Sequence, residues 1–192
     1  AVGADKAYLC SDRVFGGSDT LATSYILASA IAAIEEKEGK FDLIFSGKQA
    51  IDGDTGQVGP EIAAHMGLAQ VTYASEVSVH GDDIIVKRES DQGYDIISVR
   101  KPAVVTVVKT AFDPRFPTLK NKMAARKKPI QIITAQDIPN LDLSRCGLKG
   151  SPTKVKKTFT PVRNKTCVKI AGEEPAVSAA KVVGMLADAK VL

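Results

Sequence analysis

The chain has 192 residues, of which 44% are hydrophobic and 25% charged, and its net charge is +4. This size and composition predict one globular domain, with enough residues left for a trailing arm. The longest apolar-leaning run, Leu21 to Ile34, is interrupted by polar residues and is too short to span a bilayer, so we expect no membrane segment.

Two further compositional features narrow the class of protein. Aromatic residues make up only 5%, and no basic run alternates with them as a nucleic-acid groove requires, so we expect no nucleic-acid partner. The three cysteines, Cys10, Cys146 and Cys167, are far apart and have no metal-ligand spacing. They predict no metal site and suit a reducing cytoplasm or an organelle matrix, of which we expect the cytoplasm.

The first predicted elements are a strand and a long helix. Lys6 to Cys10 has the pattern of a short strand, and a loop with two glycines follows it. Ser18 or Asp19 can cap a helix that runs to about Lys37, since both are preferred N-cap residues. That helix is apolar nearly all round, which predicts deep burial, and Gly39 is placed to end it.

The same order then repeats. Phe41 to Ser46 is an apolar run typical of a buried parallel strand. A loop rich in Gly and Asp follows, and Pro60 is expected to open a helix to about Met66. Strand, loop and helix, occurring twice, predict an α/β fold with right-handed crossovers and a mostly parallel sheet flanked by helices.

The middle of the chain changes to strand patterns. Val71 to His80 alternates apolar and polar residues, and His80 to Asp83 has the composition of a hairpin turn. The further elements that we predict are strands at Ile84 to Glu89, Ile96 to Val99 and Ala103 to Val108 (the last one central), a helix at Leu119 to Lys128 and a strand at Ile130 to Ile133.

The end of the chain is predicted to differ from the rest. Prolines, glycines, lysines and threonines dominate Asp137 to Thr166, which we interpret as an extended arm. Glu174 to Leu192 has the pattern of an amphipathic helix. We therefore expect an α/β domain over residues 1–136 and a C-terminal arm and helix over residues 137–192.

The loop from Gly47 to Gly59 is the sharpest candidate for a binding site. Its glycines let the backbone approach a ligand closely, and the helix that follows offers free N–H groups to an anion. Asp52 and Asp54 are interpreted as residues that hold the loop by Asx-type bonds. A plain surface loop of the same composition is the alternative.

The second candidate is the loop before the long helix. Thr20 and Thr23 lie three residues apart, so their hydroxyls share a face of the first turn, and Arg13 could add a positive charge. With Asp19 as the cap and free N–H groups on this turn, a diphosphate could dock here. The alternative is a buried, capped helix without a ligand.

Catalytic constellations are absent from the sequence pattern. Gly16 to Thr20 resembles part of the loop of ATP-cleaving pyrophosphatase-loop enzymes, but Phe15 stands where that pattern has its leading Ser. His65 and His80 are interpreted as structural and solvated histidines, respectively. We therefore predict no catalytic residue, and expect a cofactor to carry the chemistry.

Three stretches resemble one family, the electron transfer flavoprotein β subunits. They are GKQAIDGDTGQVGPEIAAHMGLAQVTYASEV (Gly47 to Val77), KRESDQGYDIISVRKPAVVTV (Lys87 to Val107) and PRFPTLKNKMAARKKPI (Pro114 to Ile130). Two departures accompany the resemblance: Asp95 stands where the family usually has Glu, and the family domain normally begins with a strand and helices before Ala1, so we expect its N-terminal part to be missing here.

The resemblance implies a fold, a cofactor and partners. The fold is an adenine-nucleotide-binding α/β domain, related to universal-stress and pyrophosphatase-loop domains. The cofactor is AMP in simple members, or in electron-bifurcating members a second FAD whose AMP half fills the same site. The partners are an α subunit with its own FAD, an acyl-CoA dehydrogenase and, in bifurcating members, NADH and ferredoxin or flavodoxin. The two loops look like the bifurcating type.

The resemblance also assigns residues. It implies that the phosphate cradle consists of Gly47, Asp54, Gly56, Gln57 and Val58, and that Thr20, Thr23 and Arg13 meet the diphosphate. Leu119 matches the position that anchors a dehydrogenase, although an apolar residue in a basic helix is more often part of a core. Cys146 to Lys165 would be the arm that reaches the α subunit. A non-redox nucleotide-binding module remains the alternative to an electron carrier.

Overall fold

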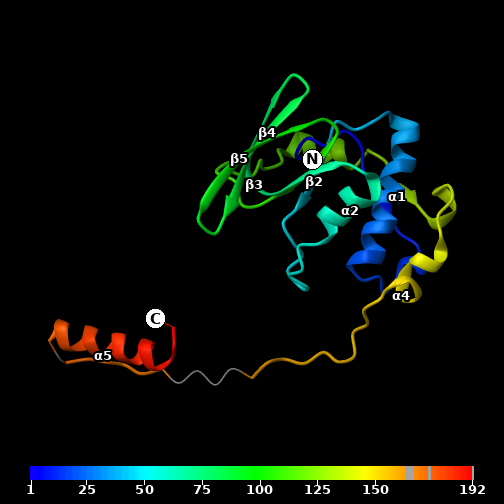
Figure 1. Ribbon diagram of the computed structural model, residues 1–192. Helices are drawn as coiled ribbons and strands as arrows, with labels where there is room; N and C mark the ends of the chain where they lie inside the picture. Colours follow the sequence, from blue (N-terminus) through cyan, green and yellow to red (C-terminus); the bar gives the residue numbers. More distant parts are fainter. Residues whose placement is uncertain (163–166, 173, 192) are drawn as a thin grey trace. The chain divides into compact units, whose positions relative to one another are not determined.

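The structure is a computed structural model that describes residues 1–162, 167–172 and 174–191. The chain forms two compact units, Ala1–Lys154 and Val155–Leu192. Figure 1 follows the chain through the elements of the first unit and then to the helix of the second. In the described part of the chain, no helix is both long enough and apolar enough to cross a membrane.

A five-stranded sheet carries the main core of the first unit. Its order is β2-β6-β3-β4-β5, in which β2, β6 and β3 run parallel and β3, β4 and β5 form an antiparallel meander. The strands are β2 (Leu43–Gly47), β3 (Ala69–His80), β4 (Asp83–Ser90), β5 (Gly93–Arg100) and β6 (Ala103–Val107). The β-branched run is thus an interior strand, as predicted, and its residues Ala103 to Thr106 are all buried.

A second, smaller pair of strands completes the sheet structure. β1 (Tyr8–Cys10) pairs in parallel with β7 (Gln131–Ile133), so that Cys10 lies opposite Ile133. Three of the five strand pairings in the described residues are therefore parallel, which confirms the mostly parallel α/β prediction. Both strands confirm predictions, made for Lys6 to Cys10 and for Ile130 to Ile133.

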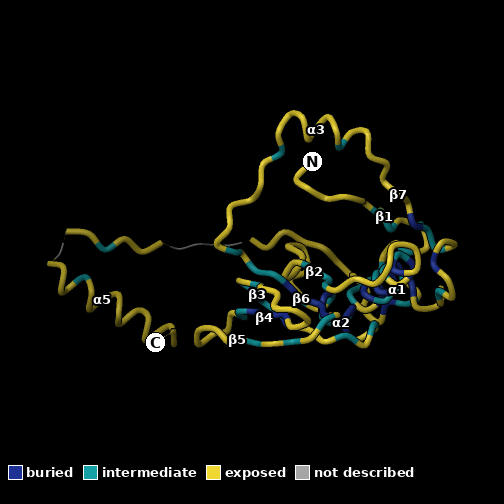
Figure 2. Tube along the Cα trace, turned by 90° about the horizontal axis from the view of Figure 1, so that it is seen from above, coloured by how far each residue is buried: buried dark blue, intermediate teal, exposed yellow. Residues whose placement is uncertain are grey.

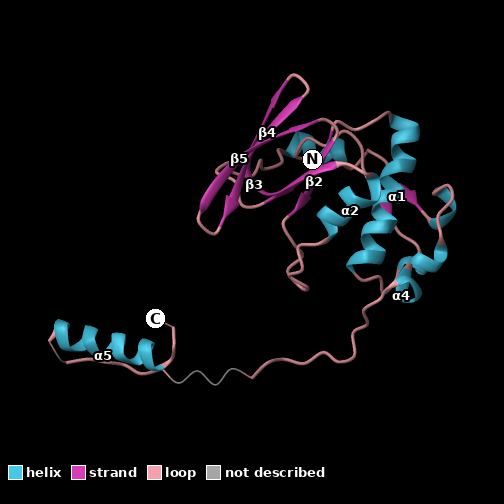
Figure 3. Ribbon diagram, in the orientation of Figure 1, coloured by secondary structure: helices cyan, strands magenta, loops and turns pink. Residues whose placement is uncertain are grey.

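The long helix α1 (Thr20–Glu38) begins and ends where the sequence predicts. Asp19 is its N-cap and accepts a hydrogen bond of 3.1 Å from the Ala22 amide, and Gly39 closes it with a φ of 95°. Small residues such as Ala22, Ala28 and Ala30 are fully buried, which allows α1 to pack against α2. Figure 3 shows the two helices on the same side of the strands.

Helix α2 (Val58–Met66) begins two residues earlier than predicted. Pro60 is the third helical residue rather than the first. The amides of the first turn have no partner within the helix, so a proline at that position removes no hydrogen bond. Gly67 ends the helix in the left-handed conformation.

Helix α3 (Leu119–Ala125) starts as predicted but is three residues shorter. The amides of Lys127 and Lys128 donate to carbonyls three residues back, at Ala124 and Ala125, so the chain leaves the α-helix as a tight turn. None of its residues is buried.

The prediction of an extended arm from Asp137 is wrong for its first part. Ile138, Cys146 and Ser151 are buried, and the turn η3 (Leu143–Arg145) and the short helix α4 (Gly147–Gly150) belong to the first unit. A few apolar residues within the Gly- and Pro-containing stretch are enough to fold it back. The boundary between the units consequently lies after Lys154 rather than at residue 136.

The second unit contains helix α5 (Pro175–Asp188), which Glu174 precedes as N-cap. The helix that we predicted from Glu174 is thereby confirmed, but its expected end, Leu192, lies outside the described residues, as does the part of the expected arm at 163–166. None of the residues of α5 is buried, and Figure 2 shows exposed or half-exposed residues along its length.

Candidate functional site

The two loops predicted from sequence meet at the N-termini of α1 and α2. One loop joins β1 to α1 and the other joins β2 to α2, and the two helices pack against each other. The hydroxyl of Thr20, the first residue of α1, donates a hydrogen bond of 3.1 Å to Oε1 of Gln57, the N-cap of α2. The fold thus joins two segments that lie 37 residues apart in the sequence.

The amides at the start of α1 are already occupied by a carboxylate. Asp19 Oδ1 accepts from the Ala22 amide, and the Thr23 amide donates to the Asp19 carbonyl. Asp19 Oδ2 accepts from both the amide and the hydroxyl of Thr153, at 3.0 and 2.8 Å. The Ala22 amide is therefore satisfied by the cap that the sequence predicts, and a carboxylate already stands at the helix start beside Thr20 and Thr23.

The charge state of Asp19 follows from these contacts. Burial works to raise the pKa of its carboxyl, but the hydrogen bonds from Thr153, Ala22 and Leu21 together outweigh burial and hold the pKa below its usual range. Asp19 is therefore ionised at neutral pH. Its negative charge interacts favourably with the positive end of the α1 dipole and so stabilises the helix.

Helix α2, in contrast, has no side-chain cap. Gln57 makes no capping hydrogen bond to the amides of α2, and its side-chain oxygen instead accepts from Thr20. The first amides of a helix have no intrahelical acceptors, and the helix dipole attracts negative charge to them. Of the two helix starts, α2 is therefore the one that is open to an anion.

The loop before α2 is held in a fixed, tight conformation. Gly56 has a φ of 64° and Asp54 a φ of 49°, both in the left-handed region. Asp54 Oδ1 accepts a hydrogen bond of 2.8 Å from Gln49 Nε2, and the Asp54 amide donates to the Ala50 carbonyl. Asp54 does hold the loop, but its carboxylate bonds to the side chain of Gln49 and not to a backbone amide, as an Asx-type bond would.

The start of α2 lies directly on the ends of two parallel strands. A Cβ atom at Gly59 would come within 2.5 Å of Thr106 Cγ2 and 2.6 Å of Ser46 Oγ. Only a glycine permits this approach. Ser46 Oγ is buried and has no hydrogen-bond partner among the described residues.

Sequence reasoning missed Tyr73. It lies at an irregularity in β3, between Val71 and Ala74, with a φ of 59° that is unusual for an aromatic residue. Its amide donates to Thr106 Oγ1 at 3.0 Å, and its ring faces the ammonium of Lys48 at 5.1 Å. The alternating pattern of this strand gave no signal of the bulge.

Other residues predicted for the site contribute in different ways. Val58 is the first residue of α2, and Gly47 is the last residue of β2, with open space where a Cβ would be. Thr23 is half-buried in the first turn of α1. Arg13 is exposed on the turn η1 (Arg13–Phe15).

The remaining candidates do not form a catalytic set. His65 is exposed and contacts the edge of Tyr25 with ring centroids 5.7 Å apart. His80 was predicted in the hairpin turn but is the last residue of β3, 3.3 Å from Ser78 Oγ. In the described part of the chain, no three His, Cys, Asp or Glu side chains form a metal-binding group.

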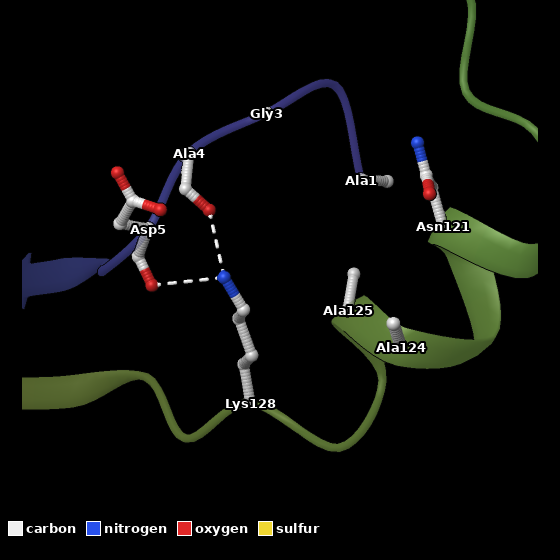
Figure 4. A pocket seen from close by; sticks show the side chains of 8 residues that line it. All are labelled: Ala1, Gly3, Ala4, Asp5, Asn121, Ala124, Ala125 and Lys128. Atoms are coloured by element: carbon white, nitrogen blue, oxygen red, sulfur yellow. Dashed lines mark hydrogen bonds between the residues drawn. The ribbon is translucent and has the colours of Figure 1, made fainter.

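A pocket between the N-terminal residues and α3 lies apart from these loops. Figure 4 shows its lining, which is mostly small side chains together with Asp5, Asn121 and Lys128. The ammonium of Lys128 donates to the carbonyls of Ala4 and Asp5, each at 3.0 Å. These two hydrogen bonds hold the N-terminal segment against the turn that follows α3.

Leu119 is exposed at the start of α3. Its side chain is 76% exposed, and Phe116 and Met123 beside it are exposed as well. Thr118 caps the helix by accepting from the Asn121 amide at 3.2 Å. The possibility that Leu119 belongs to a core is therefore excluded for this structure.

Comparison with known proteins identifies the family. Residues 1–138 match the electron transfer flavoprotein domain. The electron transfer flavoprotein subunit beta of Megasphaera elsdenii is 49% identical over 84% of this chain and 60% of its own length. The caffeyl-CoA reductase-Etf complex subunit CarD of Acetobacterium woodii is 44% identical, with the same coverage of each chain.

A third relative is described as the acryloyl-CoA reductase electron transfer subunit gamma of Anaerotignum propionicum, which is 42% identical over 91% of this chain and 66% of its own length. The chain thus spans about three fifths of the length of the curated relatives it matches. The match covers both loops of the candidate site, α1 and α2. The chain belongs to the electron transfer flavoprotein family, in which it resembles the β subunits.

Proposed function

We propose that this chain is the nucleotide-binding part of an electron transfer flavoprotein β subunit, and that it holds either the AMP half of an FAD or AMP itself. The observation that carries the proposal is the uncapped start of α2, where Gly56, Gln57 and Val58 present backbone to an anion beside Thr20. The family match supports the nature of that anion.

Within this proposal each residue has a defined role. The amides at Gln57 and Val58 bind a phosphate, and the tight turn at Gly56 lets it approach. Asp54 keeps the loop in shape through Gln49. Thr20 and Thr23 lie on the side of the diphosphate, and Arg13 and Gly47 border the site. The flavin, when bound, supplies hydride acceptance and one-electron transfer.

The proposed partners follow from the relatives. The relatives from Acetobacterium and Anaerotignum are named as components of caffeyl-CoA and acryloyl-CoA reductase systems. We therefore propose that this chain pairs with an α subunit and passes electrons to an acyl-CoA dehydrogenase. In the bifurcating form, NADH is the donor and ferredoxin or flavodoxin the second acceptor. The three free cysteines suit the reducing cytoplasm proposed for it.

A count of bound nucleotides tests the proposal. The intact protein is purified with its α subunit and denatured, and the released FAD and AMP are quantified per heterodimer. Two FAD without AMP indicate the bifurcating form, and one FAD with one AMP indicates a simple carrier with a structural AMP. One FAD and no second adenine nucleotide would contradict the proposed site.

A further inference from the structure

Lys48 is a cation in an otherwise acidic loop, yet it does not pair with the acids. It directly follows β2, and the same loop contains Asp52 and Asp54. In the described part of the chain, Lys48 takes part in no ion pair, and the Asp54 carboxylate is engaged by Gln49. The ammonium of Lys48 lies instead over the ring of Tyr73, 5.1 Å from its centroid.

The backbone of β3 places Tyr73 in this position. The register with β6 shifts between Val71 and Ala74, and Tyr73 takes up the shift with a φ of 59°. A bulky residue is disfavoured in this conformation, so surrounding contacts must hold it there. One such contact is the hydrogen bond of 3.0 Å from the Tyr73 amide to the buried Thr106.

Both residues line the turn at Gly56. A Cβ atom at Gly56 would lie 3.5 Å from the Lys48 carbonyl oxygen and 3.7 Å from the Tyr73 hydroxyl. Gly56 precedes the uncapped start of α2 by a single residue, Gln57. Lys48 is an exposed residue, and its ammonium lies over the ring of the tyrosine whose hydroxyl faces Gly56, so we expect it to be within reach of an anion that docks at this turn.

We infer that Lys48 is the cation that pairs with the phosphate at the Gly56–Val58 turn, and that Tyr73 is a positioning residue that holds the lysine through its ring face. A cation over an aromatic ring keeps its charge and its remaining N–H donors available to a phosphate. This inference rests on the proposed function, because it names the residue that neutralises the proposed nucleotide.

The test measures AMP affinity in the intact protein with its α subunit, after the bound nucleotide has been removed. Lys48→Met removes the charge and keeps most of the stem, and should weaken AMP binding about tenfold or more, since charge-assisted hydrogen bonds are the strong ones. The variant should also lose most of the dependence of AMP affinity on salt concentration. Lys48→Arg should restore much of the affinity.

Tyr73 is tested through rescue. Tyr73→Leu removes the ring face and should weaken AMP binding less than Lys48→Met, because the charge remains. Tyr73→Phe keeps the ring face and should recover most of the loss. Circular dichroism shows whether Tyr73→Leu has folded. If it has not, the Lys48 variants alone test whether Lys48 pairs with the phosphate.

The chain offers a matched control on the β4–β5 hairpin. Lys87 also stacks on a tyrosine, 4.7 Å from the ring centroid of Tyr94, but lies outside the two loops. Lys87→Met should leave AMP affinity unchanged. If Lys48→Met matches Lys87→Met in affinity and salt response, the inference is overturned while the proposed function stands. If the unaltered protein binds neither AMP nor FAD at this site, the proposed function itself is overturned.

Discussion

At the scale of single residues, Gly59 shows how closely α2 approaches the sheet. Gly59→Ala would place a methyl group 2.5 Å from Thr106 and 2.6 Å from Ser46, so either the helix or the strand ends must shift. We expect the free energy of unfolding to fall by about 1–3 kcal/mol, as for other overpacked sites. Urea denaturation measures this change.

The control for this substitution is Gly47→Ala. A Cβ at Gly47 meets nothing within 4 Å, so the unfolding free energy should stay within about 1 kcal/mol of the original. Equal stability of both variants would show that α2 does not pack as closely as described.

Single residues also show which structural roles can be predicted from the sequence. Asp19 and Gly39 were predicted as the ends of α1, because capping depends on residue type and local position. Tyr73 was not predicted to be special. Its conformation depends on the pairing of β3 with β6, in which its amide bonds to Thr106, 33 residues later in the sequence. A local sequence pattern does not reveal such a long-range contact.

At the scale of elements, Asp19 ties α1 to the segment that follows α4. Its carboxylate accepts from Thr153, and its amide donates to Ser151 Oγ at 2.8 Å. We expect Asp19→Asn to lower the free energy of unfolding by about 0.3–1 kcal/mol at neutral pH, because it removes a charge at the helix start.

This difference should depend on pH with a defined sign. The pKa of the Asp19 carboxyl is lower in the folded protein than its ordinary value, so the charge stabilises the fold above the ordinary carboxyl pKa. The stabilisation should decline as the pH falls through the lowered folded pKa. Urea denaturation of the original and Asp19→Asn from pH 7 into the acid range measures it. A stability difference that does not change with pH would rule out the charge as its cause.

The elements themselves were largely predictable, and the exceptions have physical causes. All seven strands of the described residues lie where the sequence predicted strands, although their ends differ by one or more residues. The segment after Asp137 was misjudged, because its glycines and prolines outweighed a few apolar residues such as Ile138. Gly147 belongs to the packing there, since a Cβ on it would lie 2.4 Å from the Val14 carbonyl oxygen.

At the scale of the whole molecule, two exposed apolar surfaces point to partners. Helix α5 buries none of its residues, and Val177, Val183 and Leu186 are all exposed. An element that buries so little by itself is expected to become ordered on a partner, for which we propose the α subunit. The exposed Leu119 on α3 is proposed to serve a different partner, the dehydrogenase.

Leu119→Ala tests that second assignment. If Leu119 is an interface anchor, its truncation should slow electron transfer to the dehydrogenase about tenfold or more, while the nucleotide content of the protein stays the same. Ile96→Ala is the control, because Ile96 on β5 is also well exposed, at 61%. Steady-state reduction of the dehydrogenase measures both variants, and equal rates for the two would count against the anchor.

The juxtaposition of the two loops was only partly predictable. The sequence indicated each loop through its glycines and hydroxyls, but the hydrogen bond between Thr20 and Gln57 depends on how α1 and α2 pack. Asp19 was predicted as the cap of α1, but its bonds to Thr153 and the lack of a side-chain cap on α2 were not, because they depend on how the chain folds.

The nucleotide content of Gly56→Val tests whether the turn at Gly56 is part of the nucleotide-binding site. Gly56 has a φ of 64° at the cradle, and Gly81 has a φ of 62° at the hairpin turn, so valine strains the backbone similarly at both. Each variant is purified with its α subunit, and the adenine nucleotide released from the β site is measured. We predict that Gly56→Val loses this nucleotide and that Gly81→Val keeps it. A full complement of nucleotide in Gly56→Val would contradict it.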